Sequence, residues 1–102
     1  IETLDLSYVD VTDFDFSGFT ALKTLNLKEA QNLTATQFNG ISKEAKGSIK
    51  TLDLSYIDVT DFEFSEFEAL KTLELTSFKK MTAAQFNGIS KEAKALIKYL
   101  LL

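Results

Sequence analysis

The stretch TLDLSYVDVTDFDFSGFTALKTLNLKEAQNLTATQFNGISKEAKGSIK, residues 3–50, returns with few changes as residues 51–98. Of the 48 aligned pairs 14 differ, so 34 are identical. Self-similarity at a fixed spacing is typical of a chain built from stacked units, each of which buries its apolar face against its neighbours. The repeat therefore predicts the architecture before any single element is considered.

A shorter pattern, apolar-x-x-Leu-x-Leu, recurs inside the long repeat. It takes the forms IETLDL, LKTLNL, IKTLDL, LKTLEL and IKYLLL, which begin at residues 1, 22, 49, 70 and 97. The steps between these starts are 21, 27, 21 and 27 residues. Leucines two positions apart, such as Leu4 and Leu6, lie on one face of a strand, and their neighbours lie on the other. The pattern predicts five short strands, each with one buried face.

The residues between the strands must cover those buried faces. In the first 21-residue step the apolar positions are closely spaced and leave no room for a long helix. They are Val11, Phe14, Phe16 and Phe19. This step therefore predicts a short, irregular covering segment.

The 27-residue step carries a helix signal. Thr34 and Gln37 form a capping box, and Phe38 stands where a hydrophobic staple needs an apolar residue. Phe38, Ile41 and Ala45 then share one face of the expected helix. The second module repeats the signal with Thr82, Gln85, Met81 and Phe86. We expect the capping phenylalanine of each module to be the buried anchor of its helix.

The pattern resembles the leucine-rich repeat family over essentially the whole chain. The 21-residue units look like internalin-type repeats, and the 27-residue units are similar to cysteine-containing repeats. The resemblance implies an α/β fold, namely a leucine-rich repeat solenoid with parallel strands on the concave side and short helices and irregular segments on the convex side. It also implies a single domain over residues 1–102, made of modules 1–48 and 49–96 and a fifth strand at 97–102.

The chain departs from the family pattern just after each strand. The asparagine or cysteine that usually bonds the backbone of the turn is replaced by Val9, Ala30, Ile57 and Phe78. No ladder of asparagine side chains can form there. The backbone donors of these turns must therefore find other partners.

The composition argues against several classes of function. A net charge of −4 and a pI near 4.7 do not suit a surface that holds nucleic acid or anionic lipid. The sequence shows no stretch typical of a membrane span or a signal peptide, and without Cys it implies no redox compartment. We expect no nucleic acid and no membrane among the partners, and the localisation stays open.

The chain lacks several of the residue types that catalysis most often uses. With no His and no Cys, it lacks the commonest general base, the thiol nucleophile and the commonest transition-metal ligands. The stacked carboxylates fall in one column of the exposed strand face, formed by Asp5, Asn26, Asp53 and Glu74. Nothing in that column is expected to separate two pKa values. We expect no enzyme, no cofactor and no metal.

The segment DFDFSGFTALKT, which begins at Asp13, matches the first positions of an EF-hand calcium loop. The last position, which needs a bidentate Glu, is Thr24, and the second copy replaces Gly18 with Glu66. A solvated acidic turn explains the segment better. We therefore expect no calcium at the loop aspartates Asp13, Asp15 and Asp61.

The exposed strand face is the best candidate for binding a partner. Leucine-rich repeats commonly bind proteins on their concave face, so the resemblance implies a site there. In this chain the candidate residues are Asp5, Tyr8, Asn26, Lys28, Asp53, Tyr56 and Glu74. The partner should have a basic surface, and its binding should weaken with salt.

The last motif, IKYLLL, places apolar residues where earlier strands carry Thr and a polar residue. Tyr99 and Leu101 face outward in this strand, and no convex segment follows to cover it. Exposed apolar strand edges invite pairing. We expect a second copy to cover this edge, as a closed two-fold homodimer rather than a head-to-tail ring or filament. A boundary inside a longer array is the alternative explanation.

Two functions from different classes follow from these observations. The first is a non-enzymatic scaffold, structural or engineered, that self-associates through its C-terminal edge. The second is a protein-binding module from a longer bacterial or protist array that uses its concave face. A binding array should diversify its exposed strand positions, yet most of the 14 differing pairs lie in turns and convex segments. The exceptions are Asn26/Glu74, Lys28/Thr76 and Glu29/Ser77. This distribution favours the scaffold.

Overall fold

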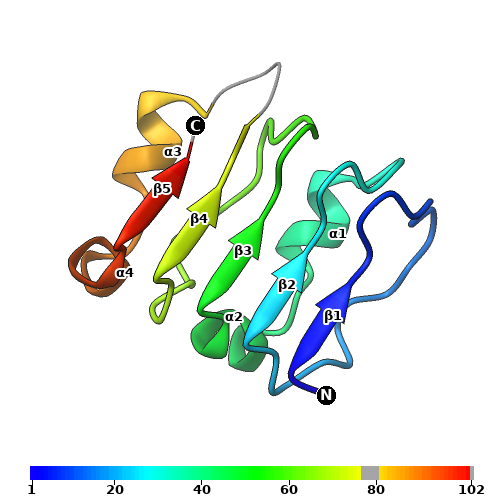
Figure 1. Ribbon diagram of the computed structural model, residues 1–102, viewed down its shortest axis with the longest axis horizontal. Coiled ribbons are helices and arrows are strands. Elements are labelled where there is room, and N and C mark those ends of the chain that lie inside the picture. The colour runs from blue at the N-terminus through cyan, green and yellow to red at the C-terminus, as the bar shows by residue number, and fades with distance from the viewer. Residues whose placement is uncertain (77–80, 102) are drawn as a thin grey trace.

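The computed structural model describes residues 1–76 and 81–101, with the backbone alone at Leu101. Five strands form one all-parallel sheet, and their order across the sheet is their order in the chain (Figure 1). They are β1 (Thr3–Asp5), β2 (Thr24–Asn26), β3 (Thr51–Asp53), β4 (Thr72–Glu74) and β5 (Tyr99–Leu101). The α/β class and the five predicted strands are confirmed. In the described part of the chain, no helix combines the length and the apolar character needed to cross a membrane.

The strands pair in the register that the repeat predicts. Equivalent positions of successive units lie side by side, so they form columns that cross the sheet at about 4.8 Å per strand. The columns are Thr3, Thr24, Thr51, Thr72 and Tyr99; Leu4, Leu25, Leu52, Leu73 and Leu100; and Asp5, Asn26, Asp53, Glu74 and Leu101. A shift of one residue would have moved the leucines to the exposed face.

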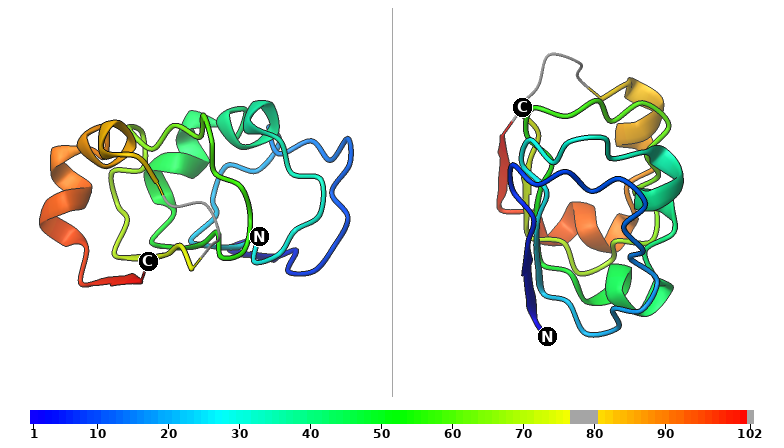
Figure 2. Two further views of the ribbon diagram at one scale, coloured as in Figure 1. Left: turned by 90° about the horizontal axis from the view of Figure 1, so that it is seen from above. Right: turned by 90° about the vertical axis from the view of Figure 1, so that its right-hand side faces the viewer.

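The segments between the strands form a second layer, which covers one face of the sheet (Figure 2). Four short helices of the described residues lie in this covering layer. They are α1 (Ala35–Asn39), α2 (Lys43–Ser48), α3 (Ala83–Asn87) and α4 (Lys91–Leu96). The two 21-residue steps contain no helix, as the sequence predicts.

Each 27-residue step contains two short helices where the sequence predicts one. In the predicted capping box of α1, the Thr34 hydroxyl accepts from the Gln37 N–H at 3.1 Å, and the Gln37 side chain accepts from the Thr34 N–H at 2.9 Å. After one turn the chain breaks, and Ser42 caps α2 by accepting from the Ala45 N–H at 3.1 Å. The Ser42 hydroxyl also donates to the Phe19 carbonyl at 2.6 Å, which ties the break to the preceding unit. Helices α3 and α4 repeat the capping pattern, so the single helix is wrong in both modules.

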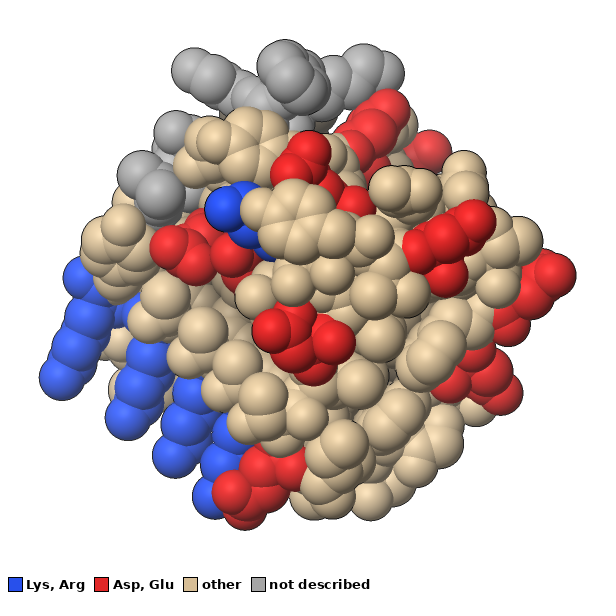
Figure 3. All heavy atoms as spheres, turned by 45° about the vertical axis from the view of Figure 1, so that its right-hand side comes forward, with Lys and Arg blue, Asp and Glu red and all other residues tan. Residues whose placement is uncertain are grey.

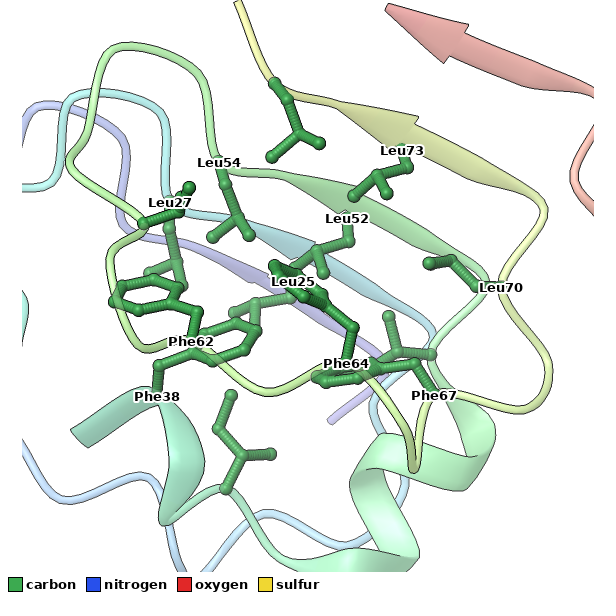
Figure 4. Packing of buried hydrophobic residues seen from close by; sticks show 14 of the residues in the cluster. Leu25, Leu27, Phe38, Leu52, Leu54, Phe62, Phe64, Phe67, Leu70 and Leu73 are labelled. Atoms are coloured by element: carbon green, nitrogen blue, oxygen red, sulfur yellow. The ribbon is translucent and has the colours of Figure 1, made fainter. Parts of the chain in front are cut away.

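The apolar core lies between the sheet and the covering layer (Figure 4). In the central column Leu25, Leu52 and Leu73 are fully buried, and burial of one such side chain contributes about 1.5–3 kcal/mol. At the two ends of the same column, Leu4 is half-buried and Leu100 is 43% exposed. Burial therefore falls from the centre of the sheet to its edges.

Phenylalanine rings fill the junction between the two modules. Phe38 of α1 is fully buried, and its ring centroid lies 4.5 Å from that of Phe62, 5.5 Å from Phe64 and 5.4 Å from Phe67 (Figure 4). Phe86, its counterpart in α3, packs on the core but is only half-buried. The prediction of a buried anchor is confirmed in the first module and wrong in the second. Phe62, Phe64 and Phe67 cover Phe38, whereas no equivalent phenylalanine segment follows α3 in the described part of the chain to cover Phe86.

Side chains of the third column hold the turns that follow the strands. The Asp5 carboxylate accepts from the Ser7 N–H at 3.0 Å. Asn26 and Asp53 accept from the N–H two residues ahead in the same way, at 3.0 and 2.9 Å. These bonds satisfy backbone donors of the turns that follow β1, β2 and β3.

Val9 and Ala30 stand where the leucine-rich repeat pattern expects an asparagine or cysteine, and their N–H groups use backbone partners. The Val9 N–H donates to the Leu6 carbonyl at 3.1 Å, and the Ala30 N–H donates to the Leu27 carbonyl at 3.0 Å. These bonds close tight turns directly after β1 and β2, which satisfies donors that would otherwise lack partners. Of the other two positions, Phe78 lies outside the described residues.

Candidate functional site

Two exposed tyrosines flank a lysine beyond the carboxyl ends of β1, β2 and β3. The Lys28 Nζ lies 5.9 Å from the centroid of the Tyr8 ring and 5.7 Å from the centroid of the Tyr56 ring. The tyrosines are 58% and 41% exposed. A cation at this distance is attracted by the negative face of each ring. We call Tyr8, Lys28 and Tyr56 the tyrosine clamp.

The backbone of the turns places the two rings. Tyr8 and Tyr56 have φ angles of 64° and 62°, and Glu29 at the equivalent position after β2 has 49°. This left-handed region is uncommon for residues with side chains and persists only where surrounding bonds enforce it. Here the Tyr8 N–H donates to the Lys28 carbonyl and the Glu29 N–H donates to the Ser55 carbonyl, both at 2.9 Å. The same turn therefore follows β1, β2 and β3, and it leaves the lysine between the two rings.

The surroundings of the clamp favour the charged lysine. A hydrogen bond with Tyr8 is the largest cause that raises the pKa of Lys28 above its ordinary value, and electrostatic interactions with Tyr8, Tyr56 and Asp53 act in the same direction. Partial loss of water acts in the opposite direction. The amine is therefore a fixed cation at neutral pH.

Asp53 and Glu74 form a carboxylate pair beside the clamp, on adjacent strands. Burial raises the pKa of Glu74 above its ordinary value of 4.5, and the charge of Asp53 and a hydrogen bond with it act in the same direction. Lys28 lowers that pKa. The sequence predicts nothing in this column that separates two pKa values, yet the strand register places these two acids side by side and the pKa of Glu74 is raised.

Two of the predicted site residues shape the turns instead of joining the clamp. The Asp5 carboxylate accepts from the Ser7 hydroxyl at 2.7 Å and from its N–H at 3.0 Å, and these bonds lower the pKa of Asp5. Asn26 accepts from the Lys28 N–H at 3.0 Å and so positions the clamp lysine. The predicted residues that the structure brings together are Tyr8, Lys28, Asp53, Tyr56 and Glu74.

The acidic turn after β1 is organised by its own side chains. The Asp15 carboxylate accepts from the Ser17 N–H at 2.8 Å and from the Ser17 hydroxyl at 2.6 Å. Asp13 has a φ of 61°, and Asp61 repeats this with 65°. Across residues 1–76 and 81–101, no group of three or more acidic, histidine or cysteine side chains is placed to hold a metal ion. The lack of calcium binding stays a prediction.

The C-terminal edge of the sheet carries exposed apolar side chains. Tyr99 is 49% exposed and Leu100 is 43% exposed, and Leu96 at the end of α4 adds a third side chain at 38%. Tyr99 continues the threonine column on the outward face, as predicted. The side chain of Leu101, the other predicted self-association residue, lies outside the described part of the structure.

Sequence reasoning places the tyrosines beside the strand columns but does not reveal the clamp. The signal is present, because residues 8, 29 and 56 share one repeat position and the lysine before position 29 falls between the rings. A second feature is also missed. The residue just before each of the last four strands is a lysine, namely Lys23, Lys50, Lys71 and Lys98.

No protein-family model, curated protein or solved structure matches the chain. Its function is therefore inferred from the geometry and charge of these surfaces.

Proposed function

We propose that the chain is a non-enzymatic leucine-rich repeat scaffold, structural or engineered, that self-associates through its C-terminal edge. Its units stack as a solenoid with the strands on the concave side. The consecutive parallel strands and the unbroken register of the repeat support this proposal. The identical capping boxes of α1 and α3 support it further, because the same local device recurs one module later.

Bonds from each helix to the preceding unit also suit a scaffold. The Gln37 amide donates to the Val11 carbonyl at 2.6 Å and to the Phe14 carbonyl at 3.1 Å. Gln85 makes the two equivalent bonds in the second module, at 2.8 and 3.1 Å. One side chain therefore caps its own helix and fixes the neighbouring segment.

Other bonds join the first module forward to the second. The Asn39 amide donates to the Asp61 carbonyl at 3.1 Å, and its oxygen accepts from the Glu63 N–H at 2.9 Å. Lys46 is buried and donates to the Asn39 carbonyl at 2.9 Å, with the Glu66 carboxylate 3.4 Å away. Polar side chains between the units are thus used for stacking, which is what a rigid scaffold requires.

The exposure of Leu100 is the observation that carries the self-association proposal. Leu25, Leu52 and Leu73 occupy the same column and are fully buried, whereas Leu100 is 43% exposed. An inward strand position that water reaches is destabilising, and a strand edge presents unpaired backbone groups beside it. A second copy would cover both.

Light scattering over a concentration series tests this proposal. The wild type should rise from monomer toward dimer mass, and Leu101→Lys should hold the chain as a monomer. Thr3→Lys is the matched control, because it adds the same charge to the outward face at the opposite edge of the sheet. A wild type that stays monomeric at its highest soluble concentration contradicts the proposal.

The tyrosine clamp favours a second function, the binding of a basic protein segment at the strand face. Exposed tyrosines are common binding hot spots, and the neighbouring Asp53 and Glu74 outnumber the clamp lysine, so the site suits a cationic partner. Anisotropy of a labelled arginine- and lysine-rich peptide should show binding that weakens with salt. The double change Tyr8→Ala and Tyr56→Ala should weaken binding, whereas Tyr99→Ala should not, because Tyr99 has an exposure between those of the two clamp tyrosines but lies away from the clamp. Equal losses in both variants would exclude the clamp as the site.

A further inference from the structure

Four lysines form a column along the amino ends of the strands. Backbone hydrogen bonds join neighbouring members. The Lys50 N–H donates to the Lys23 carbonyl at 2.8 Å, the Lys71 N–H to the Lys50 carbonyl at 2.8 Å, and the Lys98 N–H to the Lys71 carbonyl at 2.9 Å. Successive members are therefore about 4.8 Å apart, and the column is about 14 Å long. Figure 3 shows a row of lysine side chains along one edge of the molecule. We call Lys23, Lys50, Lys71 and Lys98 the lysine ladder.

Most of the ladder lysines have no ion-pair partner among the residues that the structure describes. All four side chains are exposed. Lys23 has the Glu2 carboxylate 3.3 Å away. For the other three lysines, the described residues provide no carboxylate within ion-pair distance. The backbones that carry these lysines are adjacent, so the like charges of the row repel one another and an added row of negative charge would bind favourably.

The residue after each of the first three ladder lysines adds a hydroxyl group to the same edge. Thr24, Thr51 and Thr72 form a parallel column on the outward face of the sheet and are half-buried. A hydroxyl both donates and accepts hydrogen bonds, so this column suits the amide groups of a peptide. The edge thus offers a row of cations beside a row of neutral hydrogen-bonding groups.

The charge of the rest of the molecule favours a narrow partner. The chain as a whole carries −4, and apart from Glu2 beside Lys23 the acidic side chains on the face shown in Figure 3 are spread over the surface away from the row of lysines. A nucleic acid carries charge along its whole length and would be repelled by those acids wherever it passes the ladder. A short acidic stretch of polypeptide can contact the ladder alone.

We propose that the lysine ladder is a docking surface for an extended acidic segment of another polypeptide, whose carboxylates pair with the ladder ammonium groups. This surface goes beyond the scaffold and the clamp, because it lies at the amino ends of the strands while the clamp follows their carboxyl ends. It also does not depend on self-association.

Binding of a fluorescein-labelled oligoglutamate peptide, followed by anisotropy at low and at raised ionic strength, tests the proposal. The wild type should bind at low salt and release the peptide as salt rises. Lys50→Gln with Lys71→Gln should weaken binding about fivefold, because each exposed ion pair contributes little. Lys43→Gln with Lys91→Gln is the matched control on α2 and α4, with the same change in net charge and two exposed lysines outside the ladder. It should weaken binding less.

Three results would overturn the proposal. The first is no binding of the peptide by the wild type at low salt. The second is an equal loss in the ladder and control variants, which shows that only net charge matters. The third is binding of single-stranded oligothymidylate as tight as that of oligoglutamate, which assigns the ladder to polyanions in general. Circular dichroism of both variants, with the wild-type spectrum expected, separates these results from a loss of fold.

Discussion

The Phe38 ring stacks on the Phe62 ring with centroids 4.5 Å apart and planes 13° from parallel. This contact joins helix α1 of the first module to the irregular segment that follows β3. The identical residue of the second module, Phe86, lies at the outer side of its module and is half-buried. Two copies of one sequence signal therefore differ in burial because of their position in the stack.

Phe38→Ala should lower the free energy of unfolding by about 3–5 kcal/mol, since it leaves a cavity against three rings. Such a loss is a large share of the stability of a small domain. Phe86→Ala is the matched control and should cost about half as much, because part of its ring is already in water. Urea unfolding of both variants measures the difference. Equal losses would show that the junction does not have the packing described.

Gln37→Ala should destabilise the chain by about 1–3 kcal/mol, because it removes one side of the capping box and leaves the Val11 and Phe14 carbonyls without their donor. Gln31→Ala removes an exposed glutamine side chain and should change stability by less than about 0.5 kcal/mol. Thermal unfolding monitored by circular dichroism compares the two. A Gln37 variant as stable as the Gln31 variant would mean that the bond to the preceding unit contributes nothing.

Two substitutions should shift the raised pKa of Glu74 in opposite directions. Asp53→Asn should move this pKa down toward 4.5, whereas Lys28→Ala should move it further up, because the lysine lowers it in the wild type. Asp5→Asn, two strands further from Glu74 than Asp53, is the control and should leave it unchanged. Carbon-detected NMR titration of the glutamate carboxyl groups measures all three. Shifts of equal size in Asp5→Asn and Asp53→Asn would exclude a specific pair.

The same group makes stability depend on pH. Because the folded-state pKa is raised, the protonated form favours folding, so this contribution is complete below pH 4.5 and is lost as the pH rises through the raised value. Glu74→Gln should remove that part of the pH dependence. Urea midpoints of the wild type and the variant across mildly acidic pH compare the two. An unchanged slope in the variant would assign the dependence to other groups.

Calcium should not bind at the acidic turns that contain Asp13, Asp15 and Asp61. Asp15 already accepts two bonds from Ser17, and the loop lacks the final bidentate glutamate. Calorimetric titration should show no stoichiometric heat. Binding tighter than millimolar, lost in Asp15→Asn, would reverse the interpretation of this turn.

The strands were predictable because the repeat states their positions five times. Leu4, Leu25 and their equivalents define both the inward face and the register, and a single core between two layers then follows. The break between α1 and α2 was harder to predict from the sequence. Helix α1 ends at its C-cap Gly40 and Ser42 caps α2, and the bond from Ser42 to the Phe19 carbonyl of the preceding unit fixes the place of the break.

The clamp shows where reasoning from sequence ends. Tyr8, Lys28 and Tyr56 come from three different turns, and their contact depends on a left-handed backbone at both tyrosines. Local patterns favour no such conformation for tyrosine, so the contact appears only when the turns are built in space.

Each strand of the sheet pairs only with the strands before and after it in the chain. Detaching β5 would therefore break its hydrogen-bonded pairing with β4 and leave the pairing of β1, β2 and β3 unchanged. Opening of such a sheet can begin at either edge and move inward one strand at a time. Amide hydrogen exchange should accordingly be slowest at Leu52 in β3, and exchange should become faster with each strand toward Leu4 and Leu100.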